Sequence, residues 1–224
     1  HFRIKGGFEF RDETDGSAAF SAATDWKAKT DHTIRWYNKG TFPFVRLEYK
    51  AAETEEGLEE ADWVTITNSV ANVPNAGNLT DYAWTVADPN SANYPTEPPA
   101  KFYVKLKITN LGDTSIYAES NTFSISYFDT FWVLKDDETM TLLTSQLGVR
   151  TMSGADVHWN VATGNLNSIS TGFERRLAKG VYTTIWSKTG YFDTTDADRE
   201  VNANGTFTVL MESTTPKEYR VGNG

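Results

Sequence analysis

The first eleven residues, HFRIKGGFEFR, alternate between apolar and charged side chains almost without a break. Phe2, Ile4, Phe8 and Phe10 share one parity with Gly6, and the residues between them are charged or glycine. Side chains two residues apart in a β-strand lie on the same face, so this stretch predicts a strand with one apolar face. An unpaired edge that carries such a row promotes aggregation, so the strand requires a partner.

The composition is that of a globular protein. The chain has 224 residues, of which 39% are hydrophobic and 13% aromatic, enough for a substantial core. The formal net charge of −9 argues against nucleic-acid binding and against docking on anionic lipid, which both rest on clustered Lys and Arg. We expect no membrane insertion, because no apolar run approaches the ~20 residues of a spanning helix. The absence of cysteine excludes thiolate chemistry and disulfides.

Short alternating runs rich in β-branched and aromatic residues recur along the chain, separated by Asn, Asp, Gly and Pro. They include HTIRWYN, FVRLEYK, DWVTITN, YAWTV, KFYVKLKITN and NTFSISYF. Helical patterns are scarce. The stretch AETEEGLEEAD could form one helical turn, but six carboxylates crowded around Gly57 favour a solvated loop. We therefore predict an all-β fold of two tandem β-sandwiches with an N-terminal extension strand.

The pattern changes near residues 127–129, which suggests a domain boundary. Beyond it, turns led by glycine separate the strands. We predict an N-terminal strand and tether over residues 1–16, one β-sandwich over 17–128 and a second over 129–224. The junction lacks Pro-rich or Gly/Ser-rich sequence, which favours a short connection between the sandwiches.

The spacing of particular residues within each half carries a family resemblance. The first half contains a Trp, a Thr-x-x-x-Ile-x-Trp strand, a Gly turn, a Val-x-Leu-x-Tyr strand, a Trp-x-x-Ile strand and a Ser-x-x-Phe-x-Ile strand. The residues are Trp26, Thr30, Ile34, Trp36, Gly40, Val45, Leu47, Tyr49, Trp63, Ile66, Ser120, Phe123 and Ile125. Residues 20–126 thereby resemble an Ig-like module of bacterial surface proteins. Through Gly172-Phe173, LAKGVYTTIWSKTGYFD and FTVLME, residues 130–213 resemble a carboxypeptidase-regulatory or transthyretin-like sandwich. Both resemblances imply structural or binding modules.

The sequence carries no enzyme motif. We find no Gly-x-Ser-x-Gly, His-Glu-x-x-His, phosphate-binding loop or dinucleotide fingerprint. His1, His32 and His158 are far apart and lack the local spacing of metal ligands or of a triad. A pair of catalytic carboxylates stays open, because such a pair forms in space rather than in sequence. We expect that the chain is not an enzyme and needs no cofactor.

One acidic cluster has the residue types of a calcium site. Asp193, Asp196, Asp198 and Glu200 fall within eight residues, and their carboxylate oxygens suit Ca²⁺. The spacing departs from that of an EF-hand, and Arg199 inside the cluster would compete with the ion. A solvated loop is therefore the preferred interpretation, with Ca²⁺ binding as the alternative.

Aromatic residues offer another interpretation, since 7 tryptophans and 10 tyrosines could supply a surface for stacking sugars. Most tryptophans lie at alternating strand positions between aliphatic residues, as core side chains do. Trp159 and Tyr94 lie in polar, loop-like surroundings and are the candidate carbohydrate contacts.

The opening strand has two candidate partners. It could fold back as a hairpin on SAAFSAATD, a segment that offers only Phe20 as a large apolar group. Alternatively, it could complete the sheet of a neighbouring copy, with its side chains in a groove and Gly6 at a shallow place. This second mode resembles the donor-strand assembly of bacterial pili and fibrils. Such a contact is heterologous, so it propagates into a filament unless a ring closes.

We therefore expect a structural subunit of an extracellular fibre, secreted or displayed on a cell surface. Copies of the chain would assemble through Phe2, Ile4, Gly6, Phe8 and Phe10. The alternative is a carbohydrate-binding or adhesive accessory region of a larger surface protein, with glycans as partners. Exposed, coplanar aromatic side chains on one sheet would favour that alternative.

Overall fold

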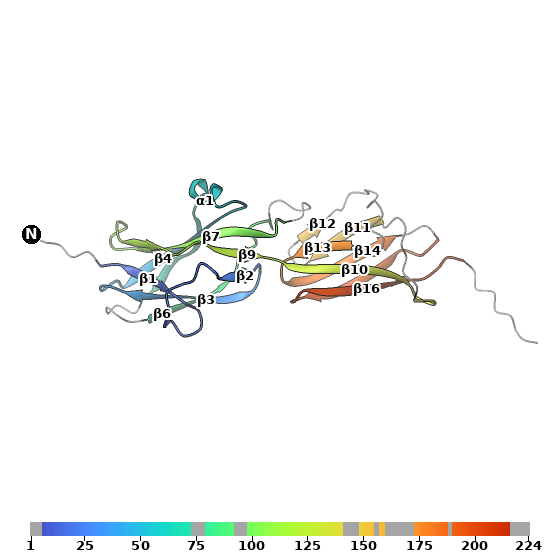
Figure 1. The fold of residues 1–224 in the computed structure, drawn as a ribbon, viewed down its shortest axis with the longest axis horizontal. Helices are drawn as coiled ribbons and strands as arrows, with labels where there is room; N and C mark the ends of the chain where they lie inside the picture. Colours follow the sequence, from blue (N-terminus) through green and yellow to red (C-terminus); the bar gives the residue numbers. More distant parts are fainter. Residues whose placement is uncertain are drawn as a thin grey trace, which may run out of the picture. The chain divides into compact units, whose positions relative to one another are not determined.

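The structure, a computed structural model, describes residues 6–72, 79–91, 98–140, 148–154, 157–159, 173–187 and 190–215. Apart from the helical turn α1 (Gly57–Glu60), every regular element described is a β-strand (Figure 1). The prediction of an all-β fold is confirmed. No described helix is long and apolar enough to cross a membrane. The chain divides into two compact units, His1–Pro89 with Pro99–Tyr127 and Asn90–Pro98 with Phe128–Gly224.

Unit 1 contains two sheets, which Figure 1 shows as separate layers. Sheet A is antiparallel and has the order β1 (Phe8–Arg11), β3 (Asp31–Asn38) and β6 (Leu79–Thr85). Sheet B has the order β2 (Asp25–Lys27), β9 (Phe123–Ser126), β7 (Lys101–Asn110), β4 (Phe44–Ala52) and β5 (Val64–Ala71). On the same side of β7 as β9 lies the short strand β8 (Tyr117–Glu119).

The core of unit 1 follows from alternation within its strands. Ile34 and Trp36 of β3 are fully buried, whereas Arg35 between them is more exposed. Val45 and Leu47 of β4 are buried in the same way on either side of Arg46. The Tyr49 ring of β4 lies 5.5 Å from the Trp84 ring of β6, so the two sheets meet through aromatic side chains. Burial of each such side chain contributes about 1.5–3 kcal/mol.

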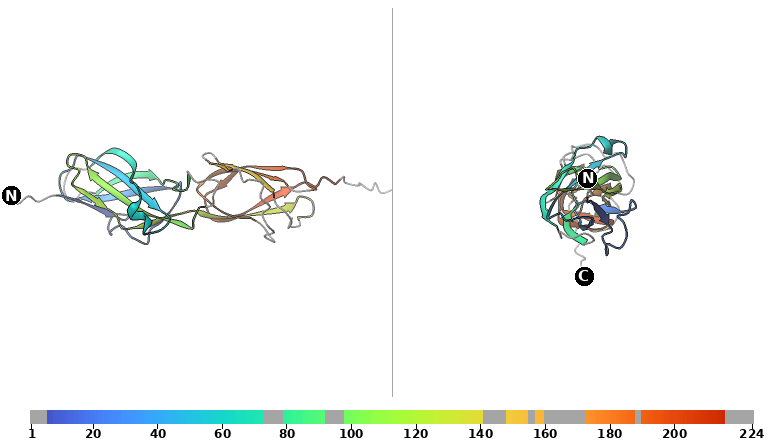
Figure 2. Two further views of the ribbon diagram at one scale, coloured as in Figure 1. Left: turned by 90° about the horizontal axis from the view of Figure 1, so that it is seen from above. Right: turned by 90° about the vertical axis from the view of Figure 1, so that its left-hand side faces the viewer.

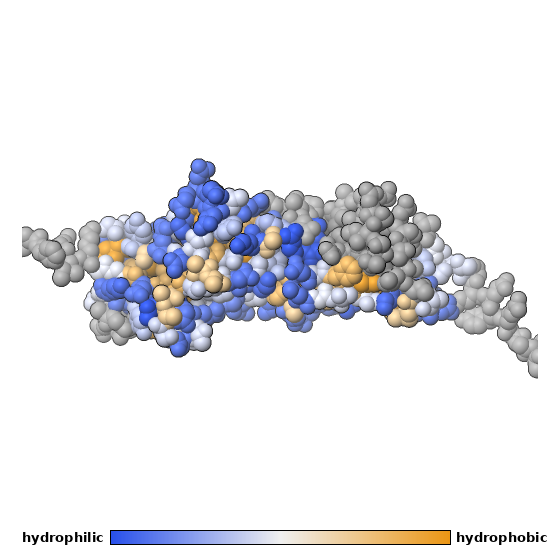
Figure 3. Space-filling view, in the orientation of Figure 1, coloured by the Kyte–Doolittle hydropathy of each residue, from blue (hydrophilic) through white to orange (hydrophobic). Residues whose placement is uncertain are grey.

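The acidic stretch at residues 53–62 differs from the solvated loop that we expected. It contains α1, whose Leu58 is fully buried while Glu59 and Glu60 are exposed. Glu59 pairs with Lys105 of β7 at 2.8 Å, which attaches the turn to sheet B. Figure 3 shows this segment as a hydrophilic protrusion. One apolar residue among carboxylates gives no helical period, so the sequence pattern did not reveal the turn.

Unit 2 also contains two sheets, seen from a second direction in Figure 2. One has the order β13 (Phe173–Leu177), β10 (Phe128–Asp136) and β16 (Gly205–Met211), with β10 antiparallel to β13 and parallel to β16. The other has the order β12 (Val157–Trp159), β11 (Gly148–Gly154), β14 (Gly180–Ser187) and β15 (Thr194–Val201). Trp132 of β10 and Trp186 of β14 are fully buried with ring centroids 5.9 Å apart, so they join the two sheets.

The N-terminal strand belongs to unit 1. The assignment of residues 1–16 to a separate segment implied that this strand lies outside the first module. Instead, β1 pairs with β3 of the same chain and is part of unit 1. The SAAFSAATD segment lies beside the end of β1, through an isolated bridge between Arg11 and Ala19 and backbone hydrogen bonds from Asp12 to Ala18 and from Phe20 to Phe10, but it forms no ladder with β1. The remaining predicted boundaries and the two module identities stay predictions.

Candidate functional site

β1 and the side chains that pack against it form the candidate site, and we call the space that β1 fills the groove. In the sheet order of the described chain, β1 is an edge strand with β3 as its neighbour. Phe8 lies opposite Asn38 and Phe10 opposite Trp36. One residue earlier, Gly7 and Lys39 exchange two backbone hydrogen bonds of 3.1 and 2.7 Å, which extends the ladder toward the N-terminus. The predicted assembly residues Phe2 and Ile4 lie outside the described residues.

The apolar face of β1 points into the core of unit 1. Phe8 and Phe10 are 7% and 6% exposed. The Phe8 ring lies 4.8 Å from the ring of Phe42, and Phe10 faces the register position of the fully buried Trp36. At about 1.5–3 kcal/mol for each phenylalanine, these two side chains provide a large part of the attachment of the strand.

Gly6 lies at a close approach where a side chain would not fit. A Cβ atom at Gly6 would lie 2.4 Å from both the Lys39 carbonyl oxygen and the Phe42 ring. At the facing Gly40, where φ is +153°, a Cβ atom would meet the same ring at 2.8 Å. The Phe42 ring therefore fills the space in front of Gly6, and the groove is shallow at this point.

A buried polar network fixes the floor of the groove. The Asn72 side-chain oxygen accepts hydrogen bonds from the Trp36 indole N–H at 2.9 Å and the Thr80 hydroxyl at 3.0 Å. The Asn72 amide nitrogen donates to the side-chain oxygen of Asn38 at 2.9 Å and to the Phe42 carbonyl at 2.8 Å. All four hydrogen-bonding positions of this amide are used, so the side chains that contact β1 are held in one arrangement.

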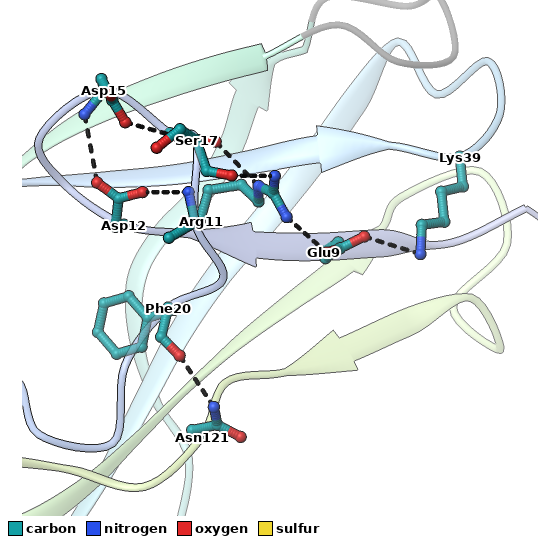
Figure 4. A network of polar contacts seen from close by, with 10 residues as sticks. Glu9, Arg11, Asp12, Asp15, Ser17, Phe20, Lys39 and Asn121 are labelled. Atoms are coloured by element: carbon teal, nitrogen blue, oxygen red, sulfur yellow. Dashed lines mark hydrogen bonds and ion pairs between the residues drawn. The ribbon is translucent and has the colours of Figure 1, made fainter.

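The outer face of β1 carries charges. Glu9 pairs with Lys39 at 2.9 Å and with Arg11 at 2.7 Å (Figure 4). The Lys39 hydrogen bond, helped by the Arg11 charge, lowers the pKa of Glu9. The Arg11 guanidinium also lies 4.7 Å from the centre of the Tyr37 ring on β3. These contacts favour the register in which Glu9 lies opposite Tyr37.

The segment after β1, residues 12–19, folds into a compact turn that we call the tether loop. The Asp12 carboxylate accepts hydrogen bonds from the backbone N–H groups of Thr14, Asp15 and Ala18. The Ala18 N–H has the largest effect in lowering the pKa of Asp12. The Arg11 guanidinium donates to the carbonyls of Gly16 and Ser17 (Figure 4). Just beyond the loop, the Phe20 carbonyl accepts a 2.9 Å hydrogen bond from Asn121.

A second cluster beside β1 was not found by sequence reasoning. The Glu13 carboxylate lies 2.8 Å from His32 Nδ1 and accepts hydrogen bonds from the Trp26 indole N–H at 3.1 Å and the Thr33 backbone N–H at 3.0 Å. The Trp26 and His32 rings stack with centroids 4.6 Å apart. With Thr30, which contacts the other His32 nitrogen, these residues form what we call the Glu13 clasp. Glu13 and His32 are brought together only by the fold, so no sequence spacing indicates them.

The predicted calcium ligands lie on or next to β15. Asp196 accepts two hydrogen bonds from Arg199, of 3.0 and 2.8 Å, so the arginine occupies this carboxylate. Asp198 has a positive φ of 55° beside the register shift in the β14–β15 ladder. Within the described residues, no group of three or more His, Asp or Glu side chains is arranged to hold a metal ion.

The two candidate carbohydrate contacts remain predictions. Tyr94 lies outside the described residues, and Trp159 ends β12 opposite Met152, with its side chain not described. The prediction that most tryptophans belong to the core is confirmed for Trp26, Trp36, Trp84, Trp132 and Trp186.

No protein-family model and no curated protein matches the chain. Solved structures match most of its length at low similarity. The pilus 2b backbone protein of group B streptococcus is 12% identical with a TM-score of 0.37, covering 93% of this chain and 98% of that one. The major pilin subunit BcpA of Bacillus cereus is 9% identical with a TM-score of 0.34, covering 94% and 71%. The shaft pilin SpaA of Lactobacillus rhamnosus GG is 11% identical with a TM-score of 0.32, covering 95% and 98%. Likenesses this distant carry no conclusion about what the chain does.

Proposed function

We propose that the chain is a structural subunit of an extracellular or cell-surface fibre, in which the N-terminal strand of each copy takes the β1 position of a neighbour. The observation that carries the proposal is the place of β1 in sheet A. It lies at the edge of sheet A, forms a ladder with one strand, β3, and turns its alternate side chains into unit 1. Identical copies can exchange an element of this kind.

Exchange is energetically feasible because the closed and exchanged states contain the same contacts. Phe8 and Phe10 would fill the same groove, and the same ladder to β3 would form, whichever copy supplies the strand. The balance is then set by the tether loop and by concentration. An intramolecular partner acts at an effective concentration in the mM range. The closed monomer therefore predominates in dilute solution, and assembly requires crowding of subunits or an opened tether loop.

Exchange in one direction produces an open chain of subunits. Each copy gives one strand and receives one, and the strand and the groove are different surfaces of the molecule. The contact is therefore heterologous and continues into a filament unless the rotation between copies closes a ring. The partner in this assembly is a second copy of the same chain.

We also propose that the subunit has no catalytic role and needs no cofactor. The sequence contains no cysteine, so disulfides between these residues do not hold copies together, and the link we propose is non-covalent strand pairing. The alternative of a carbohydrate-binding module rests on Tyr94 and Trp159, and no described contact favours it.

Engineered cysteines can trap the exchanged strand, because the chain has none of its own. Glu9 lies opposite Tyr37, two residues along from the hydrogen-bonded pair of Gly7 and Lys39. Such pairs place Cα atoms about 5.5 Å apart, within reach of a disulfide. The variants Glu9→Cys and Tyr37→Cys, mixed at high concentration and oxidised, should form a crosslinked heterodimer if strands exchange.

Two controls complete the experiment. The double variant, oxidised as a dilute monomer, should lock β1 in its own sheet and give no fibres in negative-stain electron microscopy until it is reduced. A mixture of Glu9→Cys with Thr65→Cys, on the exposed side of β5, should give no specific crosslink. The proposal fails if the mixed variants stay monomeric while the double variant closes its internal disulfide.

A further inference from the structure

The Glu13 clasp lies where the N-terminal strand joins the rest of unit 1. Arg11, opposite Arg35, is the last paired residue of β1. Two residues later, the Glu13 side chain accepts a hydrogen bond from the backbone N–H of Thr33. It thereby takes the part that a backbone carbonyl plays in a strand ladder. The clasp therefore continues the attachment to β3 beyond the end of β1. If the strand leaves together with its tether loop, the clasp has to open.

The hydrogen bonds of the clasp determine where protons reside. An ionised carboxylate only accepts, so His32 Nδ1 carries a hydrogen for Glu13. The Thr30 hydroxyl lies 2.9 Å from His32 Nε2 and 2.5 Å from the Lys27 carbonyl oxygen. A carbonyl also only accepts, so the hydroxyl hydrogen goes to Lys27, and His32 Nε2 has to donate to Thr30. All these contacts are satisfied together only when both ring nitrogens of His32 carry hydrogen.

The order of carboxylate, imidazole and hydroxyl is also that of a nucleophilic triad, but the contacts differ from those of a catalytic site. In a triad the imidazole accepts the hydroxyl proton. Here the Lys27 carbonyl competes for the proton of Thr30. The Trp26 ring also lies against the His32 ring, with an angle of 19° between their planes. The arrangement fits attachment of the tether loop better than chemistry.

We propose that the Glu13 clasp is a pH-dependent lock on strand exchange, closed while His32 is protonated and loosened when the imidazole loses its second proton. In the neutral imidazole, Nε2 and the Lys27 carbonyl compete for the one hydrogen of Thr30, so one hydrogen bond is lost. The charge attraction between His32 and Glu13 is lost as well. The biological meaning of the lock rests on the proposed function, whereas its operation concerns the closed monomer.

Other charges around His32 are engaged elsewhere. Asp25 and Lys27 pair with each other at 3.7 Å, and Asp31 accepts a hydrogen bond from Thr85. The remaining charged groups of the neighbouring turn, strands and tether loop also have partners: Asp12, Asp15, Lys29, Arg35 and Asp81. Glu13 is the carboxylate in hydrogen-bonding contact with the His32 ring.

Hydrogen–deuterium exchange of the dilute monomer tests the lock without requiring a fibre. After correction for intrinsic rates, amides of residues 7–11 and 33–39 should exchange about two- to tenfold faster at pH 8 than at pH 5.5, as expected for one lost hydrogen bond. His32→Gln should exchange fast at both pH values. Glu13→Gln should also reduce protection, and His158→Gln, on β12 of unit 2, should retain the wild-type pH dependence.

The outcomes separate the lock from the proposed function. Equal protection of the wild type at both pH values, or a pH dependence that persists in His32→Gln, would overturn the lock. If protection depends on pH through His32 but the cysteine variants form no crosslinked heterodimer, the pH-dependent lock is supported and the proposed fibre assembly is rejected. If crosslinked heterodimers form but protection does not depend on pH, strand exchange is supported and the pH-dependent lock is rejected.

Discussion

The first strands of the two units, β1 and β10, occupy different places in their sheets. β1 lies at the edge of sheet A beside β3, whereas β10 lies at the centre of its sheet, between β13 and β16 (Figure 1). Removing β1 breaks one ladder, but removing β10 breaks an antiparallel and a parallel ladder together. The neighbours of a strand, rather than its sequence pattern, decide whether it is detachable.

The side chains of β1 and β10 also differ in what surrounds them. Trp132 of β10 is completely buried, with ring centroids 5.9 Å from Trp186 and 4.7 Å from Phe207. Phe8 and Phe10 of β1 are also buried, but the opposite face of this strand carries charged side chains. Both strands thus contribute side chains to a core, but β10 is paired along both of its edges, whereas β1 forms a ladder along one edge.

The largest effect should come from β10. Trp132→Ala should destabilise unit 2 by about 3–5 kcal/mol, because it leaves a cavity between the two sheets. Urea denaturation measures the loss, and hydrogen exchange assigns it to β10, β14 and β16. Trp132→Phe keeps an aromatic ring and should cost less. Lost protection in β1 and β3 of the Ala variant would contradict the expectation that the effect is confined to unit 2.

A smaller effect is expected at the N-terminal end of β1. Gly6→Ala should cost about 1–3 kcal/mol, because its methyl group would collide with the Phe42 ring and with a backbone carbonyl that cannot move freely. Gly7→Ala is the matched control, since a Cβ at Gly7 meets nothing within 4 Å. Urea midpoints and hydrogen exchange of residues 7–11 measure both. Equal effects of the two substitutions would remove the shape argument for Gly6.

Strong acid should loosen β1. The pKa of Glu9 is lowered by the Lys39 hydrogen bond, that of Asp12 by the Ala18 N–H and that of Asp15 by Ser17. A lowered folded-state pKa gives stabilisation that is complete above about pH 5, where the unfolded-state carboxyl group is also ionised, and that is lost as the pH falls through the lowered value.

We therefore expect protection of residues 7–18 to decrease between about pH 4 and pH 2. Together with the Glu13 clasp, this places the tightest attachment of β1 at mildly acidic pH. Asp12→Asn should show reduced protection already at pH 5. Constant protection of these residues down to pH 2 would show that their carboxylates do not hold the strand.

The smallest effect is expected at Lys39. Its ammonium group pairs with Glu9 at 2.9 Å, but both side chains are well exposed. Lys39→Met should change hydrogen exchange of β1 by less than about threefold, and 0.5 M salt should have a similar effect on the wild type. A larger change than that of Gly6→Ala would mean that charge, and not shape, anchors the strand.

Local patterns predicted much of this fold. Alternation identified the strands, and the buried faces of β3 and β4 follow it, as in Ile34 with Trp36 and Val45 with Leu47. Such periodicity is a property of neighbouring residues, so it can be recognised without knowing how strands pair. The same pattern identified Phe8 and Phe10 as one face of a strand.

Contacts between distant segments could not be predicted in this way. Alternation in β1 does not reveal that its partner is β3 rather than the adjacent SAAFSAATD segment, because many strands offer a complementary edge. The clasp between Glu13 and His32 and the buried contacts of Asn72 depend on the same pairing. These residues carry no sequence signal of their own.

The close approach at Gly6 has a consequence for the accuracy of assembly. A donor strand displaced by two residues would still turn its apolar side chains inward, so alternation alone cannot reject the error. That displacement would bring Ile4 or Phe8 to the place where Phe42 leaves room only for a hydrogen atom. Misaligned strands would bind poorly and dissociate, and every junction in the proposed fibre would have the same length. The uniform spacing of subunits would then depend on Gly6, a residue without a side chain.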